Sequence, residues 1–293
     1  MNKRECIELI NDFVDDWLYG DINYLHEFDL SEIKDDEKYG MIDSNLTESD
    51  PDNTVIANAI YTVVWDEIIP DLSFDNLGSG KKYRGETLNS YNTLFGKPKE
   101  IYYEGKPVGL SFMNYTSFES IKIENEKLSM RVCEFYERYH NIGNMMPLPN
   151  KSIITNGANT LNSYKGVGVW HDYCDIFLVD LHKVLIKDSN SDEGIDEKLK
   201  QLVNVNNNFF NNYHGKDGFE KFINDFYLDC YYDSESSSIK NLFSPHEFHW
   251  SLQMKKMGED EYFNTVIPYI ETCDKIIEYR CNCIINKLKQ VLY

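Results

Sequence analysis

The strongest constraint on the fold is a helical pattern that runs from Asp260 to Leu292, close to the C-terminus. Apolar residues recur there three or four positions apart, the spacing that places side chains on one face of a helix. These residues are Phe263, Val266, Ile267, Ile270, Ile276, Ile277, Ile284, Ile285 and Leu288. Pro268 lacks the backbone N–H that a helix interior uses, so we expect it to start or kink the helix. The segment predicts the longest helix of the chain.

The same spacing predicts several shorter helices. They cover residues 3–18, 52–69, 124–139, 172–185, 195–210 and 217–231. The apolar content of the second helix also leaves open a strand around residues 62–65. Two extended segments joined by a Gly-Lys-Pro turn predict a β-hairpin over residues 99–113, and residues 117–123 could add a strand. The chain is therefore expected to have an α+β fold that is predominantly helical, with a small antiparallel hairpin or sheet near residues 99–123.

We expect residues 1–293 to form a single globular domain. The chain is 42% hydrophobic and 14% aromatic, which is enough material for a sizeable buried core. No internal repeat with the period of a solenoid is present. The serine-rich segment from Asp233 to Ser238 is the best linker candidate, so a weak subdivision could fall near residues 232–240.

The charge and the cysteines limit the classes of partner. The net charge is −20, from 49 acidic and 29 basic residues. Extended binding to a nucleic-acid backbone needs clustered Lys and Arg, and no such cluster occurs. No apolar run approaches the roughly 18–20 residues that span a membrane, and the acidic N-terminal segment is unlike a signal peptide. Seven scattered cysteines suit a reducing compartment, so we expect a cytoplasmic protein without extended nucleic-acid binding or membrane contact.

The most site-like stretch runs from Tyr136 to Asn150, where a helix end meets a turn rich in Gly, Asn and Pro. His140 is the candidate general acid or base, held at the rim of a polar pocket with a pKa near neutrality. Asn144 would orient a ligand in the same pocket. Two structural interpretations compete with this hypothesis. A protonated His is favoured at a helix C-terminus, and Gly143 and Asn144 could be required only for a positive φ.

Arg84 and Asn89 are the candidate ligand-binding residues of a second stretch. We expect a short helix from Asn89 to Gly96, with Arg84 just before it. A guanidinium beside free N-terminal amides forms a good anion site. The alternative is that Arg84 pairs with a carboxylate, since the chain holds many. The preceding Gly-Ser-Gly-Lys segment lacks the spacing of a phosphate-binding P-loop, and we expect a mobile loop there.

No metal site, cofactor or catalytic signature is predicted. His246 and His249 could share a helix face, but their spacing to each other and to Cys281 and Cys283 is not that of a zinc site. No Ser or Cys lies in a known nucleophile motif. The sequence therefore predicts neither a metal nor a cofactor, and it does not decide whether the protein is an enzyme.

Three sequence blocks carry a family resemblance. They are YRGETLNSYNTLFG at residues 83–96, YHNIGNMMPLP at 139–149 and DYCDIFL at 172–178. Together they resemble a family of uncharacterised bacterial proteins, a domain of unknown function, over about the middle third of the chain. The resemblance implies a bacterial or phage setting and no activity or catalytic residue. The Tyr-Arg-Gly triplet is also similar to the NAD-binding strand of ADP-ribosyltransferases, whose later Ser and Glu-x-Glu elements have no convincing match.

Two functions fit these observations. In the first, a polar pocket binds an anionic small molecule such as a nucleotide, in a setting of stress or phage defence. Arg84 would hold the anion, Asn89 and Asn144 would orient it, and His140 would move protons. In the second, the protein is a non-catalytic acidic interaction protein, an inhibitor or nucleic-acid mimic, that docks a basic protein partner. The first hypothesis requires Arg84 and His140 to lie in one pocket.

Overall fold

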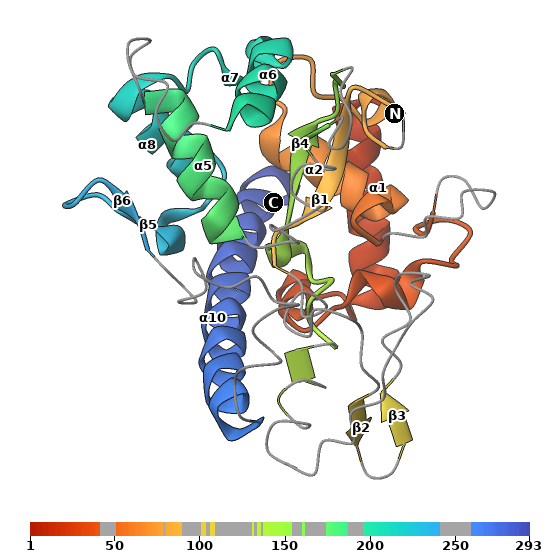
Figure 1. Cartoon of the computed structure of the whole chain (residues 1–293). Helices are drawn as coiled ribbons and strands as arrows, with labels where there is room; N and C mark the ends of the chain where they lie inside the picture. The colour runs from red at the N-terminus through yellow and green to blue at the C-terminus, as the bar shows by residue number, and fades with distance from the viewer. Residues whose placement is uncertain are drawn as a thin grey trace.

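The computed structural model of the chain is drawn in Figure 1. The residues that it describes are 1–41, 51–78, 80–89, 101–103, 106–108, 131, 134–135, 137–153, 160–161, 174–186, 196–240 and 259–293. The backbone alone is described at residues 101–103, 106–108 and 259–266.

Helices dominate the described residues. The α-helices are α1 (Lys3–Trp17), α2 (Val55–Trp65), α5 (Cys174–Ile186), α6 (Glu197–Val205), α7 (Asn207–Phe210), α8 (Gly215–Asp225) and α10 (Glu259–Leu292). The strands are β1 (Tyr83–Thr87), β2 (Ile101–Tyr103), β3 (Lys106–Val108), β4 (Met145–Pro149), β5 (Tyr232–Asp233) and β6 (Ser238–Ile239). They pair antiparallel as β1–β4, β2–β3 and β5–β6. The predicted α+β class, predominantly helical with small antiparallel sheets, is confirmed.

Helix α2 lies at the centre of the hydrophobic core. All its residues from Ile56 to Trp65 are buried. Helices α1 and α10 pack against it and contact each other, an arrangement that can be followed in Figure 1. The Trp65 indole N–H donates to the backbone oxygen of Asp225 at 2.9 Å, which ties the end of α2 to the end of α8. One core cluster therefore includes side chains from α1 through α10.

Local signals explain where the first helices begin. The side chain of Asn2 accepts the backbone N–H of Glu5 at 3.0 Å, and the Glu5 carboxylate accepts the Asn2 N–H at 2.7 Å. This capping box satisfies two amide donors at the start of α1. Thr54 caps α2 in a similar way, through its hydroxyl. The alternative of a strand at residues 62–65 is wrong, because these residues are helical.

Strands β1 and β4 form a ladder that the sequence did not predict. Tyr83 pairs with Pro149 at one end of it. Gly85 is required at its centre, because a Cβ there would lie 1.9 Å from the backbone oxygen of Asp52. One end of the ladder lies at Tyr83 and Pro149, and the other lies at Thr87 and Met145.

Other predictions have mixed outcomes. The hairpin expected over residues 99–113 is confirmed in its central part, where β2 pairs with β3. Lys106 and Pro107 of the expected turn belong to β3, and residues 109–113 lie outside the described residues. Pro268 lies inside α10 and not at its start. Residues 232–240 contain the β5–β6 hairpin, and Tyr232 belongs to the common core cluster. The expected strand at residues 117–123 lies outside the described residues.

Candidate functional site

Asn89 and Asn144 lie together in the core, just beyond the end of β1. The Asn144 amide donates to the backbone oxygens of Asn89 and Tyr139, both at 2.7 Å. Its Oδ1 accepts the Asn89 backbone N–H at 3.2 Å. Both side chains are buried, with exposed fractions of 0% and 1%. These hydrogen bonds join two backbone segments, so both amides have a structural role, and ligand binding by them stays a prediction.

Arg280 of α10 is the core residue that the sequence did not reveal. Its guanidinium donates to the backbone oxygens of Gly143, Met145 and Phe226, the last two at 3.0 and 3.3 Å. Burial lowers its pKa, but a guanidinium remains charged in proteins. Within the described residues, no carboxylate forms an ion pair with it. Three carbonyl dipoles therefore stabilise this buried cation in place of a counter-ion.

Helix α10 also lies directly against Gly143. A Cβ at Gly143 would lie 2.2 Å from the backbone oxygen of Ile277 and 2.9 Å from the Cβ of Cys281. Neither Gly143 nor Asn144 has a positive φ. The interpretation that this turn needs them for a positive φ is therefore wrong. Gly143 is required because the helix backbone approaches it so closely.

His140 is buried beside Asp29. Its Nδ1 lies 3.7 Å from Oδ1 of Asp29, and its backbone N–H donates to the other carboxylate oxygen at 3.2 Å. Only 3% of the residue is exposed. Burial lowers the pKa of His140 to about 3 and raises that of Asp29 to about 6. The expected pKa near neutrality is therefore wrong, and the ring is neutral and enclosed at neutral pH.

Arg84 is half-buried and lies within β1, opposite Leu148. Residues 83–87 are extended, and Asn89, the expected first residue of a short helix, is not helical. The helix expected over residues 89–96 lies, from residue 90 onward, outside the described residues. The predicted anion site at a helix N-terminus is therefore not formed by the described part of this stretch.

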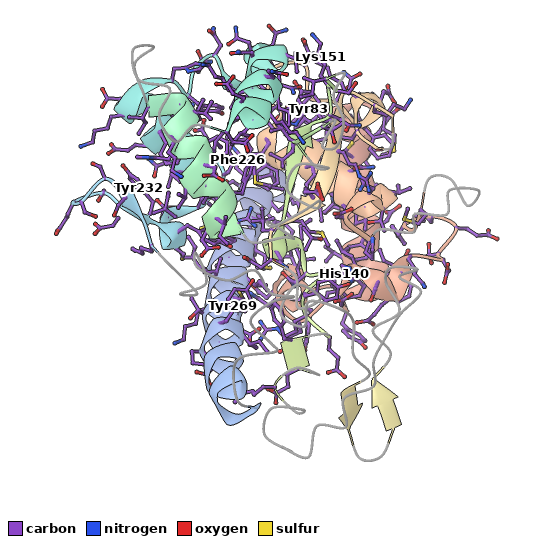
Figure 2. The ribbon with its side chains drawn as sticks, in the orientation of Figure 1. Tyr83, His140, Lys151, Phe226, Tyr232 and Tyr269 are labelled. Atoms are coloured by element: carbon purple, nitrogen blue, oxygen red, sulfur yellow. The ribbon has the colours of Figure 1, made fainter. Side chains whose placement is uncertain are left out.

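The ladder also separates Arg84 from the other three candidates. At about 3.3 Å per residue, roughly 10 Å of strand lies between Arg84 and Thr87, and Asn89 follows beyond. Figure 2 shows Tyr83, the neighbour of Arg84, near the upper edge of the molecule and His140 well below it. The structure brings Asn89 and Asn144 together and places Arg84 toward the opposite end of the ladder.

A surface cleft lies at the end of the ladder that carries Tyr83. Its volume is about 580 Å³, within the range of about 300–1,000 Å³ that small-molecule sites occupy. It is lined by Gly80, Lys81, Lys82, Tyr83, Pro149, Asn150, Lys151, Asn204, Val205, Asn206, Asn207, Asn208 and Phe209. Tyr83 and Lys151 mark its position at the top of Figure 2. We call it the Lys–Asn cleft.

The Lys–Asn cleft is basic although the protein is acidic. Lys81, Lys82 and Lys151 are exposed there, and no Asp or Glu is among the described residues that line it. Lys82 forms an ion pair with Asp71 at 2.6 Å. The amines of Lys81 and Lys151 form no ion pair with the described carboxylates. The local charge of the cleft is therefore positive, and a concave surface with charges of one sign concentrates counter-ions of the other.

Hydrogen bonds hold the three walls of the cleft in place. The backbone N–H of Lys151 donates to Oδ1 of Asn206 at 3.2 Å, and the Asn206 amide donates back to the Lys151 oxygen at 3.1 Å. The N–H of Asn150 donates to the Lys82 oxygen at 2.9 Å. These bonds connect the turn before β1, the end of β4 and the end of α6. The lysine backbones are thus fixed while their side chains remain exposed.

The floor of the cleft is aromatic and closed. Tyr83 and Phe209 are buried, and their ring centroids lie 6.4 Å apart. The Tyr83 hydroxyl donates to the backbone oxygen of Pro70 at 2.5 Å, and burial raises the pKa of Tyr83 to about 12. The exposed polar side chains of the cleft are therefore the lysines and amides of its walls.

The cleft was not identified from the sequence, although the lysines and asparagines that line it are visible there. The sequence places Lys81 in an expected mobile loop, and it places Asn204, Asn206, Asn207 and Asn208 near the end of the helix expected over residues 195–210. A lysine-containing turn and an asparagine-rich segment in the same chain were the only indication of the cleft in the sequence. This indication could not show that the two segments meet, because they lie far apart in the chain.

Other candidate chemistry finds little support in the described part of the chain. No three His, Cys, Asp or Glu side chains there are grouped so that they could hold a metal ion. His246 and His249 lie outside the described residues. The described cysteines are free thiols. None of the described helices is both long and apolar enough to cross a membrane.

Comparison with known proteins gives no relative from which a function could be transferred. No family model matches the chain, and no curated protein or solved structure shows significant similarity to it. The resemblance of the three sequence blocks to an uncharacterised bacterial family stays a prediction. The geometry of the molecule is therefore the basis for the function proposed next.

Proposed function

We propose that the protein binds an anionic small molecule, a phosphate compound such as a nucleotide, in the Lys–Asn cleft. The observation that carries this proposal is the lining itself. Three lysines and five asparagines, with no carboxylate among the described lining residues, meet in a chain of net charge −20. An acidic protein that is selected only for solubility has no need to concentrate its lysines in one concave site.

The residue types suit this class of ligand. Each lysine ammonium is a compact charge with three donors, which suits phosphate oxygens. Lys81 and Lys151 have no carboxylate partner among the described residues, so their charge is available to a ligand. The asparagine amides add neutral donors and acceptors that would orient it. The ligand class is that of the sequence hypothesis, while Lys81, Lys82 and Lys151 replace Arg84 as the anion-binding residues.

The cellular setting is part of the same proposal. We place the protein in a reducing cytoplasm, which the free cysteines support. The bacterial or phage origin and a role in stress or phage defence follow from the resemblance of the sequence blocks alone. The proposal concerns binding, because the buried His140 offers no exposed acid or base.

The test is a thermal-shift titration with inorganic tripolyphosphate. A ligand at about 100 times its Kd should stabilise the folded protein by roughly 2.7 kcal/mol, which appears as a higher melting temperature. We expect this shift in the wild type and its loss in Lys81→Ala/Lys151→Ala. The control is Lys216→Ala/Lys275→Ala, which removes the same charge from exposed positions outside the cleft. Equal shifts in all three proteins, or equal loss in both variants, would reject the cleft as the site.

A second candidate function is supported by a different surface. Tyr19 and Tyr24 are 87% and 47% exposed, and their rings form an edge-to-face pair with centroids 5.5 Å apart. Exposed carboxylates at Asp15, Asp21 and Glu27 are close to them in sequence. Aromatic faces with nearby carboxylates attract Lys and Arg, as the docking of a basic protein partner would require. Such binding would be unaffected by the cleft lysine variants.

A further inference from the structure

Five asparagines form an exposed row that begins in the Lys–Asn cleft and continues beyond it. The row consists of Asn204, Asn207, Asn208, Asn211 and Asn212, all of them exposed. Asn204 lies in α6, Asn207 and Asn208 lie in α7, and Asn211 and Asn212 follow α7 directly.

These amides differ from the other asparagines of the cleft. The Asn206 side chain is buried and is used by the backbone of Lys151. By contrast, the five side chains of the row form no hydrogen bond with any described residue. Asn204, Asn207 and Asn208 line the cleft, and the other two extend the row along the surface. An elongated ligand that enters the cleft would therefore meet free donors and acceptors next to the lysines.

We propose that the row is a subsite for the nucleoside part of a nucleotide whose phosphates lie among Lys81, Lys82 and Lys151. This inference rests on the proposed function and adds the identity of the ligand's neutral part. An asparagine amide presents one donor and one acceptor side by side, the pattern that pairs with a base edge such as that of adenine. The ligand is a mononucleotide and not a nucleic-acid strand, because the three cleft lysines are too few for extended phosphate contact.

The closed floor supports the same assignment of roles. Tyr83 and Phe209 are 1% and 3% exposed, so their ring faces are not available for stacking on a base. Recognition of the base must then come from hydrogen bonds to the exposed amides. A sugar phosphate would satisfy the lysines equally well but would leave most of the row without a partner. The site would therefore bind a nucleotide more tightly than a sugar phosphate of equal charge, because only the nucleotide has a base that reaches the amides.

The experiment is calorimetric titration of the protein with AMP and with ribose 5-phosphate, which carry the same phosphate group. We expect AMP to bind the wild type at least about 10-fold more tightly, since a single bidentate contact between an amide and a base discriminates by about this factor or more. In Asn207→Ala/Asn208→Ala this preference should fall to below about 3-fold while ribose 5-phosphate binding is unchanged. The control Asn11→Ala/Asn224→Ala removes two amides elsewhere and should retain the preference.

Failure of this inference can be distinguished from failure of the proposed function. Equal affinity for AMP and ribose 5-phosphate, with tripolyphosphate binding intact, would overturn the nucleoside subsite and leave the anion site standing. An AMP preference that survives in Asn207→Ala/Asn208→Ala would also overturn it. Absence of any anion binding would overturn both proposals.

Discussion

Two regions of this protein use the same residue types in opposite ways. In the core, Asn144 and Arg280 are buried and donate to backbone carbonyl groups. In the Lys–Asn cleft, Asn208 and Lys81 are exposed and have no hydrogen-bond or ion-pair partner through their side chains among the described residues. The amide of Asn144 and the guanidinium of Arg280 hold the fold together, whereas Asn208 and Lys81 are available to a ligand under our proposal. The contrast shows that a candidate binding residue is recognised by its exposure and by its lack of a partner within the protein, and not by its residue type.

The physical reason is the cost of leaving a polar group without a partner. Buried away from water, an unsatisfied donor or acceptor costs roughly 1–3 kcal/mol, so most polar groups of a core have a partner. At the surface, water satisfies the same group at no such cost. A cleft amide can therefore exchange water for a ligand, while a core amide cannot leave its carbonyl. The comparison can be tested by identical substitutions in the two regions.

The largest effect is expected when a cation is replaced by methionine. Arg280→Met leaves the carbonyl groups of Gly143, Met145 and Phe226 without their donor, at roughly 1–3 kcal/mol for each buried acceptor. We expect the free energy of unfolding to fall by on the order of 3 kcal/mol or more. Lys81→Met, the matched change in the cleft, should alter it by less than about 0.5 kcal/mol. Urea denaturation followed by circular dichroism measures both.

Equal stability of the two methionine variants would contradict the comparison. If Arg280→Met were as stable as Lys81→Met, the apolar side chain would have compensated for the lost hydrogen bonds, as can happen when buried charges are replaced. Arg280 would then be dispensable for the fold. An Arg280→Met protein that is insoluble beside a soluble Lys81→Met protein would be the extreme form of the expected result.

A smaller effect is expected when an amide is removed. Asn144→Ala loses the hydrogen bonds to Asn89 and Tyr139 and exposes a small cavity, so we expect a loss of about 2 kcal/mol. Asn208→Ala in the cleft should change stability by less than about 0.5 kcal/mol. Thermal unfolding of the two variants under one condition provides the measurement. Equal destabilisation would mean that the cleft asparagine has a structural partner too.

The helices could be predicted from the sequence because their signals are local. The apolar spacing that predicts α1, α2 and α10 lies within each segment, as does the capping box at Asn2. The β1–β4 ladder could not be predicted in this way. β4 contains Pro147 and Pro149, which lack the N–H that a strand donates, and its partner lies about sixty residues earlier. From sequence alone, a segment with two prolines predicts a turn, and only the position of its partner strand shows that it is a β-strand.

The candidate site was harder to predict than the fold, because it depends on which distant segments meet. His140, Asn89 and Asn144 looked like pocket residues, since polar groups next to a Gly-rich turn suit both a site and a buried network. Their burial shows that they belong to a buried network and not to an exposed site, and burial cannot be inferred from the local sequence. The cleft has the opposite problem. Each of its segments looks like an ordinary exposed loop, and only their assembly concentrates the charge.

The smallest effect is expected from pH, through His140 and Asp29. The pKa of His140 is lowered to about 3 in the folded protein, so its contribution to stability is lost as the pH falls from about 6.5. The pKa of Asp29 is raised to about 6, so its contribution is gained as the pH falls from about 6 toward its ordinary value. Between pH 6.5 and 5 the two oppose each other, and we expect their net effect to be below about 1 kcal/mol at 1.36 kcal/mol per pKa unit.

Single variants should separate the opposing parts. Relative to the wild type, His140→Gln should become more stable as the pH falls from 6.5 to 5, and Asp29→Asn should become less stable, each by on the order of 1 kcal/mol. Urea midpoints at several pH values measure the divergence, and Asn208→Ala, which removes no titrating group, should follow the wild type. If both variants also followed the wild type, the pKa values of His140 and Asp29 would be the same in the folded and the unfolded protein. His140 would then be a solvent-accessible group, and the proposed contrast between the buried core and the exposed cleft would fail at this residue.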